Sequence, residues 1–393
     1  MTSAAVYDPD PELKRPAFSD AEYARRDAAT RAVMRASGVD ALVLYGTPGQ
    51  DAEIQYLSGF RVTREAMLVY PLDGAPALYI EYFNHTPHAR RATTRADVRW
   101  GGDDLAATVA GDLRERGLAA ARLGYAGPLP VQRYLRLRQA APQAELADLS
   151  DALRRLRLVK SDEELAFLRE GARLTDRAAT ALAEQARPGM TEHELIAIIE
   201  GAYLSAGGQT GIHYLASTPM ENPERCVPAQ QPSGRALQVG DALITELSAH
   251  YQGYSGQILR PYAIGAAPSP TYQRMFAIAV EAFERIAGVI KAGASTEDAL
   301  DAAELIHAAG YTIYDDLLHG YGGGYLPPIL RTRRTSATPP PPFIFAENMT
   351  VVIQPNVITT DERSGVQVGE LVRVTRDGVE RMHTYPMRFT RCG

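Results

Sequence analysis

The chain of 393 residues is too long for one ordinary hydrophobic core and predicts two domains. Its composition, 45% apolar and 22% charged, is that of a globular protein, and its net charge of -6 argues against a nucleic-acid partner. The first residues carry no secretion-signal pattern, and no run approaches the roughly 18 apolar residues of a membrane span. Cys226 and Cys392 stand in no metal-binding or redox spacing, so we expect a cytoplasmic protein with no membrane partner.

The first domain, placed at 1–155, alternates helix and strand patterns in the manner of an α/β domain. In chain order the pattern predicts a helix over 21–37, strands over 41–45, 66–70 and 75–81, and helices over 103–116 and 131–140. Beyond this point the pattern becomes charged and helical, and Ser161 with Glu164 forms a capping box. The boundary therefore lies just before this helix.

The second domain, placed at 156–393, begins with helices. From Asp241 the apolar residues recur with a period of two, which is typical of strands. The pattern predicts helices over 161–185 and after Thr191, strands over 242–248 and 254–264, helices over 269–291 and 295–309, and strands over 349–355, 366–375 and 380–385. Helices followed by strands, occurring twice, suggest an internal pseudo-repeat.

Several stretches resemble the creatinase, aminopeptidase P and prolidase family, in the right order from about residue 153 to the end. They read LRLVKSDEEL, GMTEHEL, RALQVGDALITELSAHYQGYSGQILR, LHGYGGG, NMTVVIQPNV and GVQVGELVRVT, with a weaker match at IQYLSGF in the first domain. The resemblance implies an α+β chain with a pita-bread second domain, preceded by a smaller creatinase-type α/β domain. It also implies a homodimer.

Metal-dependent members of this family hold two divalent ions with two Asp, one His and two Glu, because paired metals need bridging carboxylates. The resemblance places those five positions on Glu246, Gln257, His319, Gln354 and Gly369. Only one carboxylate and one imidazole remain. We therefore expect no metal and no other cofactor, although Glu246, His319 and Glu370 leave a weak single-metal site as an alternative.

Creatinase works without metal, using a histidine as proton shuttle, yet this chain departs from that pattern too. The shuttle is expected between Ser217 and Arg235, a stretch that contains no histidine, and Arg225 falls near its place. A second family histidine is replaced around Tyr325. Neither known chemistry transfers intact.

The remaining polar residues still suggest a site for a small-molecule substrate. His319 is either a general acid or base or a former ligand now bonded in the core. Glu246 and Glu370 need a proton, a cationic substrate or an internal partner such as Arg260. The candidate catalytic residues are His319, Glu246, Tyr254 and Glu370, and the candidate substrate-binding residues are Gln257, Gln354, Arg225, Tyr321, Tyr325, His213 and Arg260.

Three functions stay open at this point. The first is a metal-independent hydrolase of an amide or amidine C–N bond in a small polar molecule. The second is a cyclase, isomerase or lyase that uses the same acid and base groups in a specialised biosynthetic pathway, since fold does not fix reaction. The third is an inactive protein that binds a peptide or protein in the old groove.

Overall fold

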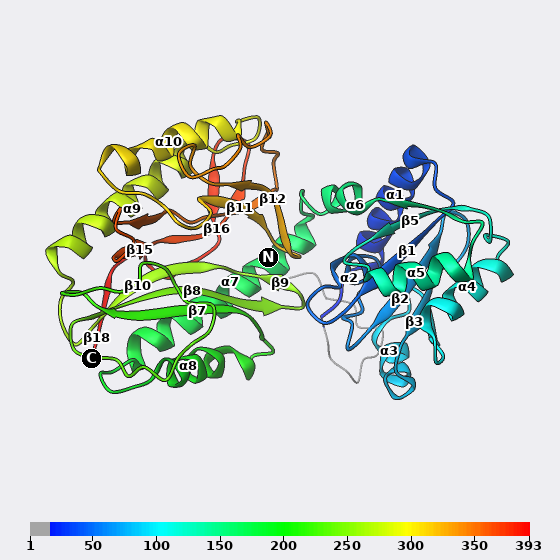
Figure 1. Cartoon of the computed structure of the whole chain (residues 1–393), viewed down its shortest axis with the longest axis horizontal. Helices are drawn as coiled ribbons and strands as arrows, with labels where there is room; N and C mark the ends of the chain where they lie inside the picture. The colour runs from blue at the N-terminus through cyan, green and yellow to red at the C-terminus, as the bar shows by residue number, and fades with distance from the viewer. Residues whose placement is uncertain (1–15) are drawn as a thin grey trace. The chain divides into compact units, whose positions relative to one another are not determined.

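The chain divides into two structural units between Arg157 and Leu158 in the computed structural model, which describes residues 16–393 (Figure 1). The division falls two residues after the expected domain boundary. Each unit has its own hydrophobic cores.

The first unit contains a six-stranded mixed sheet in the order β4-β3-β2-β1-β5-β6. Strand β1 runs antiparallel to β2 and parallel to β5. The elements are α1 (Asp20–Ser37), β1 (Ala41–Gly46), α2 (Ala52–Ser58), β2 (Ala66–Pro71), β3 (Ala77–Ile80), η1 (Phe83–His85), α3 (Thr86–Ala92), β4 (Asp97–Trp100), α4 (Leu105–Glu115), β5 (Arg122–Ala126), α5 (Val131–Ala140), β6 (Glu145–Asp148) and α6 (Ser150–Leu156).

Both faces of this sheet are buried under helices. Leu42 and Leu44 of β1 pack in one core with Met34 of α1, whereas Val43 and Tyr45 pack in a second core that includes residues of α4 and α5. A strand covered on both faces is apolar at every position, which is why β1 reads as an unbroken hydrophobic run.

The second unit combines four long helices with a ten-stranded sheet and a two-stranded one. Its helices are α7 (Asp162–Gln185), α8 (Glu192–Leu204), α9 (Pro270–Val289) and α10 (Thr296–Ala308). Its strands are β7 (Gln209–Pro219), β8 (Asp241–Tyr251), β9 (Tyr254–Ser255), β10 (Ile258–Ile264), β11 (Leu318–Tyr321), β12 (Tyr325–Leu330), β13 (Thr350–Ile353), β14 (Asn356–Ile358), β15 (Gly365–Gln367), β16 (Gly369–Val374), β17 (Val379–Arg381) and β18 (Thr390–Cys392).

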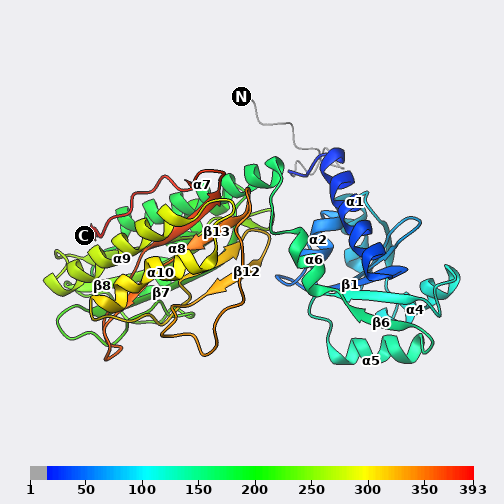
Figure 2. The ribbon, with the colours of Figure 1, turned by 90° about the horizontal axis from the view of Figure 1, so that it is seen from above.

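The large sheet follows the order β12-β11-β13-β16-β10-β8-β7. Helices α7 and α8 pack along β7 and β8, and α9 and α10 lie side by side along the other half (Figures 1 and 2). The two helix pairs and their strands form the pita-bread arrangement, with the α7–α8 core and the α9–α10 core on separate parts of the sheet.

Helix α7 approaches the strands closely at two glycines. A Cβ atom on Gly256 would lie 2.4 Å from the Cα atom of Ala172, and one on Gly171 would lie 2.8 Å from the backbone nitrogen of Gly256. Only glycine permits this contact. It fixes the backbone beside Gln257.

Most long elements match the sequence predictions. The capping boxes at Ser161 and Thr191 are present. The predicted strand over 366–375 is instead two strands, β15 and β16, and that over 380–385 is only β17. Within residues 16–393, no helix has the length and apolar character needed to cross a membrane.

Candidate functional site

Four of the five expected positions meet as side chains on one face of the large sheet. Glu246 of β8 and Gly369 of β16 both lie opposite Leu259 of β10, so the three share a face. Leu243, Leu247 and Ala249, which alternate with Glu246 on β8, pack in the α7–α8 core on the other face. Gln257, His319 and Gln354 reach Glu246 or one another by hydrogen bonds.

These four side chains, Glu246, Gln257, Gln354 and His319, form a continuous polar chain that we call the amide-linked cluster. Gln257 donates from Nε2 to Glu246 Oε1 at 2.7 Å and to Gln354 Oε1 at 3.2 Å. The same Gln354 oxygen lies 3.2 Å from His319 Nε2, while His319 Nδ1 lies 3.1 Å from the carbonyl oxygen of Gly320. Two neutral amides thus join a carboxyl group to an imidazole.

Burial makes both ends of the cluster neutral near pH 7. Burial, followed by the charges of Asp315 and Asp316, raises the pKa of Glu246 to about 8. Burial lowers the pKa of His319 to about 4. A protonated carboxyl and an unprotonated imidazole are an acid and a base in their reactive forms.

Two tyrosines line this cluster. The rings of Tyr325 and His319 stack with centroids 4.2 Å apart, and the Tyr325 hydroxyl donates to Asp316. Tyr321 contacts His319 edge-on and is buried, which raises the pKa of its phenol. Tyr254 differs, because its hydroxyl donates to Glu164 of α7 at 2.9 Å. Its contacts are those of a packing residue.

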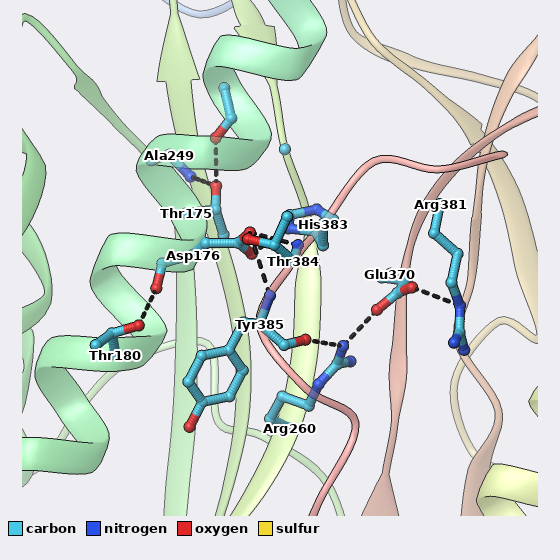
Figure 3. A network of polar contacts seen from close by, with 12 residues as sticks. Thr175, Asp176, Thr180, Ala249, Arg260, Glu370, Arg381, His383, Thr384 and Tyr385 are labelled. Carbon is cyan, nitrogen blue, oxygen red and sulfur yellow. Dashed lines mark hydrogen bonds and ion pairs between the residues drawn. The ribbon is translucent and has the colours of Figure 1, made fainter.

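The strand pleat separates Glu370 and Arg260 from the cluster, contrary to our expectation that they converge with Glu246. Glu370 lies opposite Ile258 and Ile353, one residue out of step with Gly369, and therefore on the other face. There it pairs with Arg260 and, at 2.9 Å, with Arg381 (Figure 3). The internal arginine partner that we considered is present at Glu370.

His213 and Arg225 also lie outside the cluster. His213 is opposite Leu247 on the helix-facing side of β7, where its Nε2 atom is 2.6 Å from the hydroxyl of Tyr203. Arg225 pairs with the buried Glu192 at 3.2 Å. The buried Nδ1 atom of His213 has no hydrogen-bond partner among residues 16–393.

Two family models match this sequence. The model of metallopeptidase family M24 matches residues 166–376, and that of the creatinase/prolidase N-terminal domain matches residues 26–159. The chain belongs to metallopeptidase family M24. It is 28% identical over 385 residues to a "Probable dipeptidase PepE" of Mycobacterium tuberculosis, covering 93% of this chain and 96% of that one.

Other peptidases are similar to the M24 chain in sequence or in fold. It is 24% identical to the "Uncharacterized peptidase YqhT" of Bacillus subtilis over 87% of this chain and 92% of that one. The solved dipeptidase PepE of Mycobacterium ulcerans superposes with a TM-score of 0.77 at 26% identity, covering 95% and 99% of the two chains. The Xaa-Pro dipeptidase of Bacillus anthracis, at 22% identity, shares the fold with a TM-score of 0.78 over 94% and 99%.

The residues of this M24 chain do not fit the metal pair that the family implies. Within residues 16–393, no group of three or more His, Cys, Asp or Glu side chains is arranged to hold a metal ion. Gln257 and Gln354 bond to each other, and Gly369 has no side chain. A Cβ atom on Gly369 would lie 2.3 Å from the carbonyl oxygen of Ile353, so the strands leave no room for a glutamate there.

Three residues beside the cluster were absent from the candidate list drawn from the sequence. Asp315 and Asp316 precede β11 and act electrostatically on Glu246, and Tyr214 of β7 lies directly opposite Glu246. The adjacent carboxylates three and four residues before His319 were the available signal. Tyr214 became visible only through the strand register.

Proposed function

We propose that this M24 chain is a metal-independent acid–base enzyme acting on a small polar molecule, most simply by hydrolysing an amide or amidine C–N bond. The amide-linked cluster carries the proposal. Its two ends are a neutral carboxyl and a neutral imidazole, and its two middle positions are amides where the relatives' metals need anions.

In this mechanism His319 takes a proton from water as the water oxygen bonds to the substrate carbon. Glu246 gives its proton to the leaving nitrogen as the C–N bond breaks. A neutral imidazole has one N–H, and both ring nitrogens of His319 lie beside an oxygen, so the unprotonated nitrogen must move from Gly320 or Gln354 toward water to act as the base. Proton exchange with water then restores both groups.

The same pair would also serve an isomerisation or elimination. The absence of histidine from residues 217–235, where a hydrolytic member is expected to keep its shuttle, favours this second candidate. Turnover in ¹⁸O-labelled water separates the two reactions, because only hydrolysis places the label in the product.

The test is metal content and metal dependence of the tag-free protein after exposure to manganese, zinc, cobalt and iron. We expect no stoichiometric retention, and turnover of amides or amidines that is insensitive to chelators. His319→Ala should lower kcat/KM by about 10²- to 10⁴-fold. His193→Ala, at an exposed histidine whose ring bonds to the Pro232 carbonyl, is the control. Two tightly held ions per chain would overturn the proposal.

A further inference from the structure

The amide-linked cluster is closed to solvent. Glu246 is 8% exposed, and Gln257, His319 and Gln354 are each exposed by 2% or less. A substrate cannot reach side chains that offer so little surface. A site that takes in substrate and releases product therefore has to open.

A half-exposed aromatic ring covers the imidazole end of the cluster. Tyr325 begins β12, and its ring stacks on that of His319 with the centroids 4.2 Å apart and the planes 32° apart. Tyr325 is 47% exposed, whereas the stacked His319 is almost fully buried. The tyrosine ring therefore lies between His319 and solvent.

The hydroxyl of Tyr325 holds the ring in this position. It donates to Oδ2 of Asp316, whose other carboxylate oxygen lies 3.3 Å from Nε of Arg331. A hydrogen bond to a carboxylate is stronger than one between neutral groups. The Arg331 side chain is half-exposed, so solvent weakens its attraction to Asp316. Tyr325 is thus fastened by a contact that can break without unfolding a helix or a strand.

The turn before Tyr325 allows its backbone to move. Gly322, Gly323 and Gly324 connect β11 to β12, and all three have positive φ, a conformation that glycine adopts without strain. Strand β12 ends the large sheet, and among the described strands only β11 pairs with it. Loop residues of this kind often serve as hinges. The end of the hairpin that carries Tyr325 is therefore suited to move.

We propose that Tyr325 is a gate over His319, held shut by Asp316 and hinged at the three glycines. The ring turns away to admit substrate, and it excludes bulk water from the cluster when it returns. This inference rests on the proposed function for its purpose, because His319 is the base in that reaction. The gate itself concerns access to His319 and is tested without turnover.

Reaction of the histidines with diethyl pyrocarbonate, followed residue by residue with mass spectrometry, tests the gate in the full-length protein. The reagent modifies accessible, unprotonated imidazoles, so near pH 7 the exposed His193 should react fast and His319 slowly. Tyr325→Phe keeps the ring but loses the hydroxyl. It should raise the His319 rate about tenfold, because a hydrogen bond to a charged group no longer opposes opening. Tyr325→Ala removes the ring and should raise the rate further.

Matched variants separate the gate from a general loosening. Asp316→Ala breaks the same hydrogen bond from the other side, so it should match Tyr325→Phe, and the double variant should add nothing. Tyr314→Phe, which removes the hydroxyl of an exposed tyrosine in the same unit, should leave the His319 rate unchanged. The fully buried ring of His383 is the internal control, because loosening of the second unit would speed its modification as well.

Fast modification of His319 in the wild type, or a rate that Tyr325→Phe leaves unchanged, would overturn the gate. A rise that His383 shares would assign the effect to loosening and overturn it too. Retention of two metal ions would reject the proposed function, whereas an unchanged His319 rate in Tyr325→Phe would reject the gate alone.

Discussion

Glu246 is a carboxyl group whose environment opposes its charge. Only 8% of the residue is exposed, its hydrogen-bond partner is a neutral amide, and Asp315 and Asp316 lie nearby. Its pKa of about 8 in the folded chain exceeds the value of 4.5 for a free glutamate. The stability associated with the protonated form is therefore fully present below pH 4.5 and is lost as the pH rises through about 8.

Glu246→Gln should remove the loss of folding stability at high pH, because an amide stays neutral at every pH. Between about pH 5 and about pH 9, we expect the free energy of unfolding of the wild type to fall relative to the variant by on the order of 2 kcal/mol or more. Urea unfolding at both pH values measures the difference. The exposed Glu281 of α9 supplies the control Glu281→Gln. A pH-independent difference for Glu246→Gln would show that the carboxyl titrates normally.

At the residue level the sequence identified the cluster but not everything around it. The motif order placed Glu246, Gln257, His319 and Gln354 together, and the structure joins them by hydrogen bonds. Glu370 was misplaced because one position along a strand reverses the face, a distinction that requires the register. Gln367 gave no sequence signal, since the hydrogen bond from its side chain to Asp315 joins residues far apart in the chain.

Strands β13 and β16 leave no space for a side chain at Gly369. They approach so closely at Gly369 that a Cβ atom there would lie 2.3 Å from the Ile353 carbonyl oxygen and 2.7 Å from the Gln354 Cα atom. Both atoms belong to the backbone, so neither can turn aside. Any side chain must push the strands apart and disturb Gln354.

Gly369→Ala should therefore destabilise the second unit by about 1–3 kcal/mol, as overpacking does elsewhere. Gly378→Ala is the matched control, because a Cβ atom at Gly378, in the neighbouring turn before β17, meets nothing within 4 Å. Urea unfolding followed by circular dichroism compares the two variants. Equal stabilities would mean that the strands make room for a side chain at Gly369.

Element prediction succeeded where local chemistry specifies the ends. Ser161 and Thr191 begin helices through capping boxes, and α5 has the bounds predicted for it. It failed where the signal is short, as in β4 and β6, and at Val368, which separates β15 from β16 within one run of buried residues. The break at Val368 arises because β15 pairs with β14, whereas β16 pairs with β10 and β13. Tertiary contacts, not the local sequence, decide this pairing.

Among residues 16–393, the molecule contains two sets of hydrophobic cores that share no residue across the division at Arg157 and Leu158. Units with separate cores are expected to unfold as separate cooperative steps. The chain offers a direct reporter, because its single tryptophan, Trp100, ends β4 of the first unit. Its ring contacts Phe83 and its indole nitrogen donates to the Glu81 carbonyl, both in the same unit.

Trp100 fluorescence should then follow only the first unit, while far-ultraviolet circular dichroism follows both. In Gly369→Ala, we expect the urea midpoint of the dichroism component from the second unit to fall by the amount argued above, with the fluorescence midpoint unchanged. The substitution lies in β16 and touches only residues of the second unit. A fluorescence midpoint that moves with the dichroism would show instead that one cooperative transition spans both units, because destabilising the strands around Gly369 would then unfold Trp100 as well.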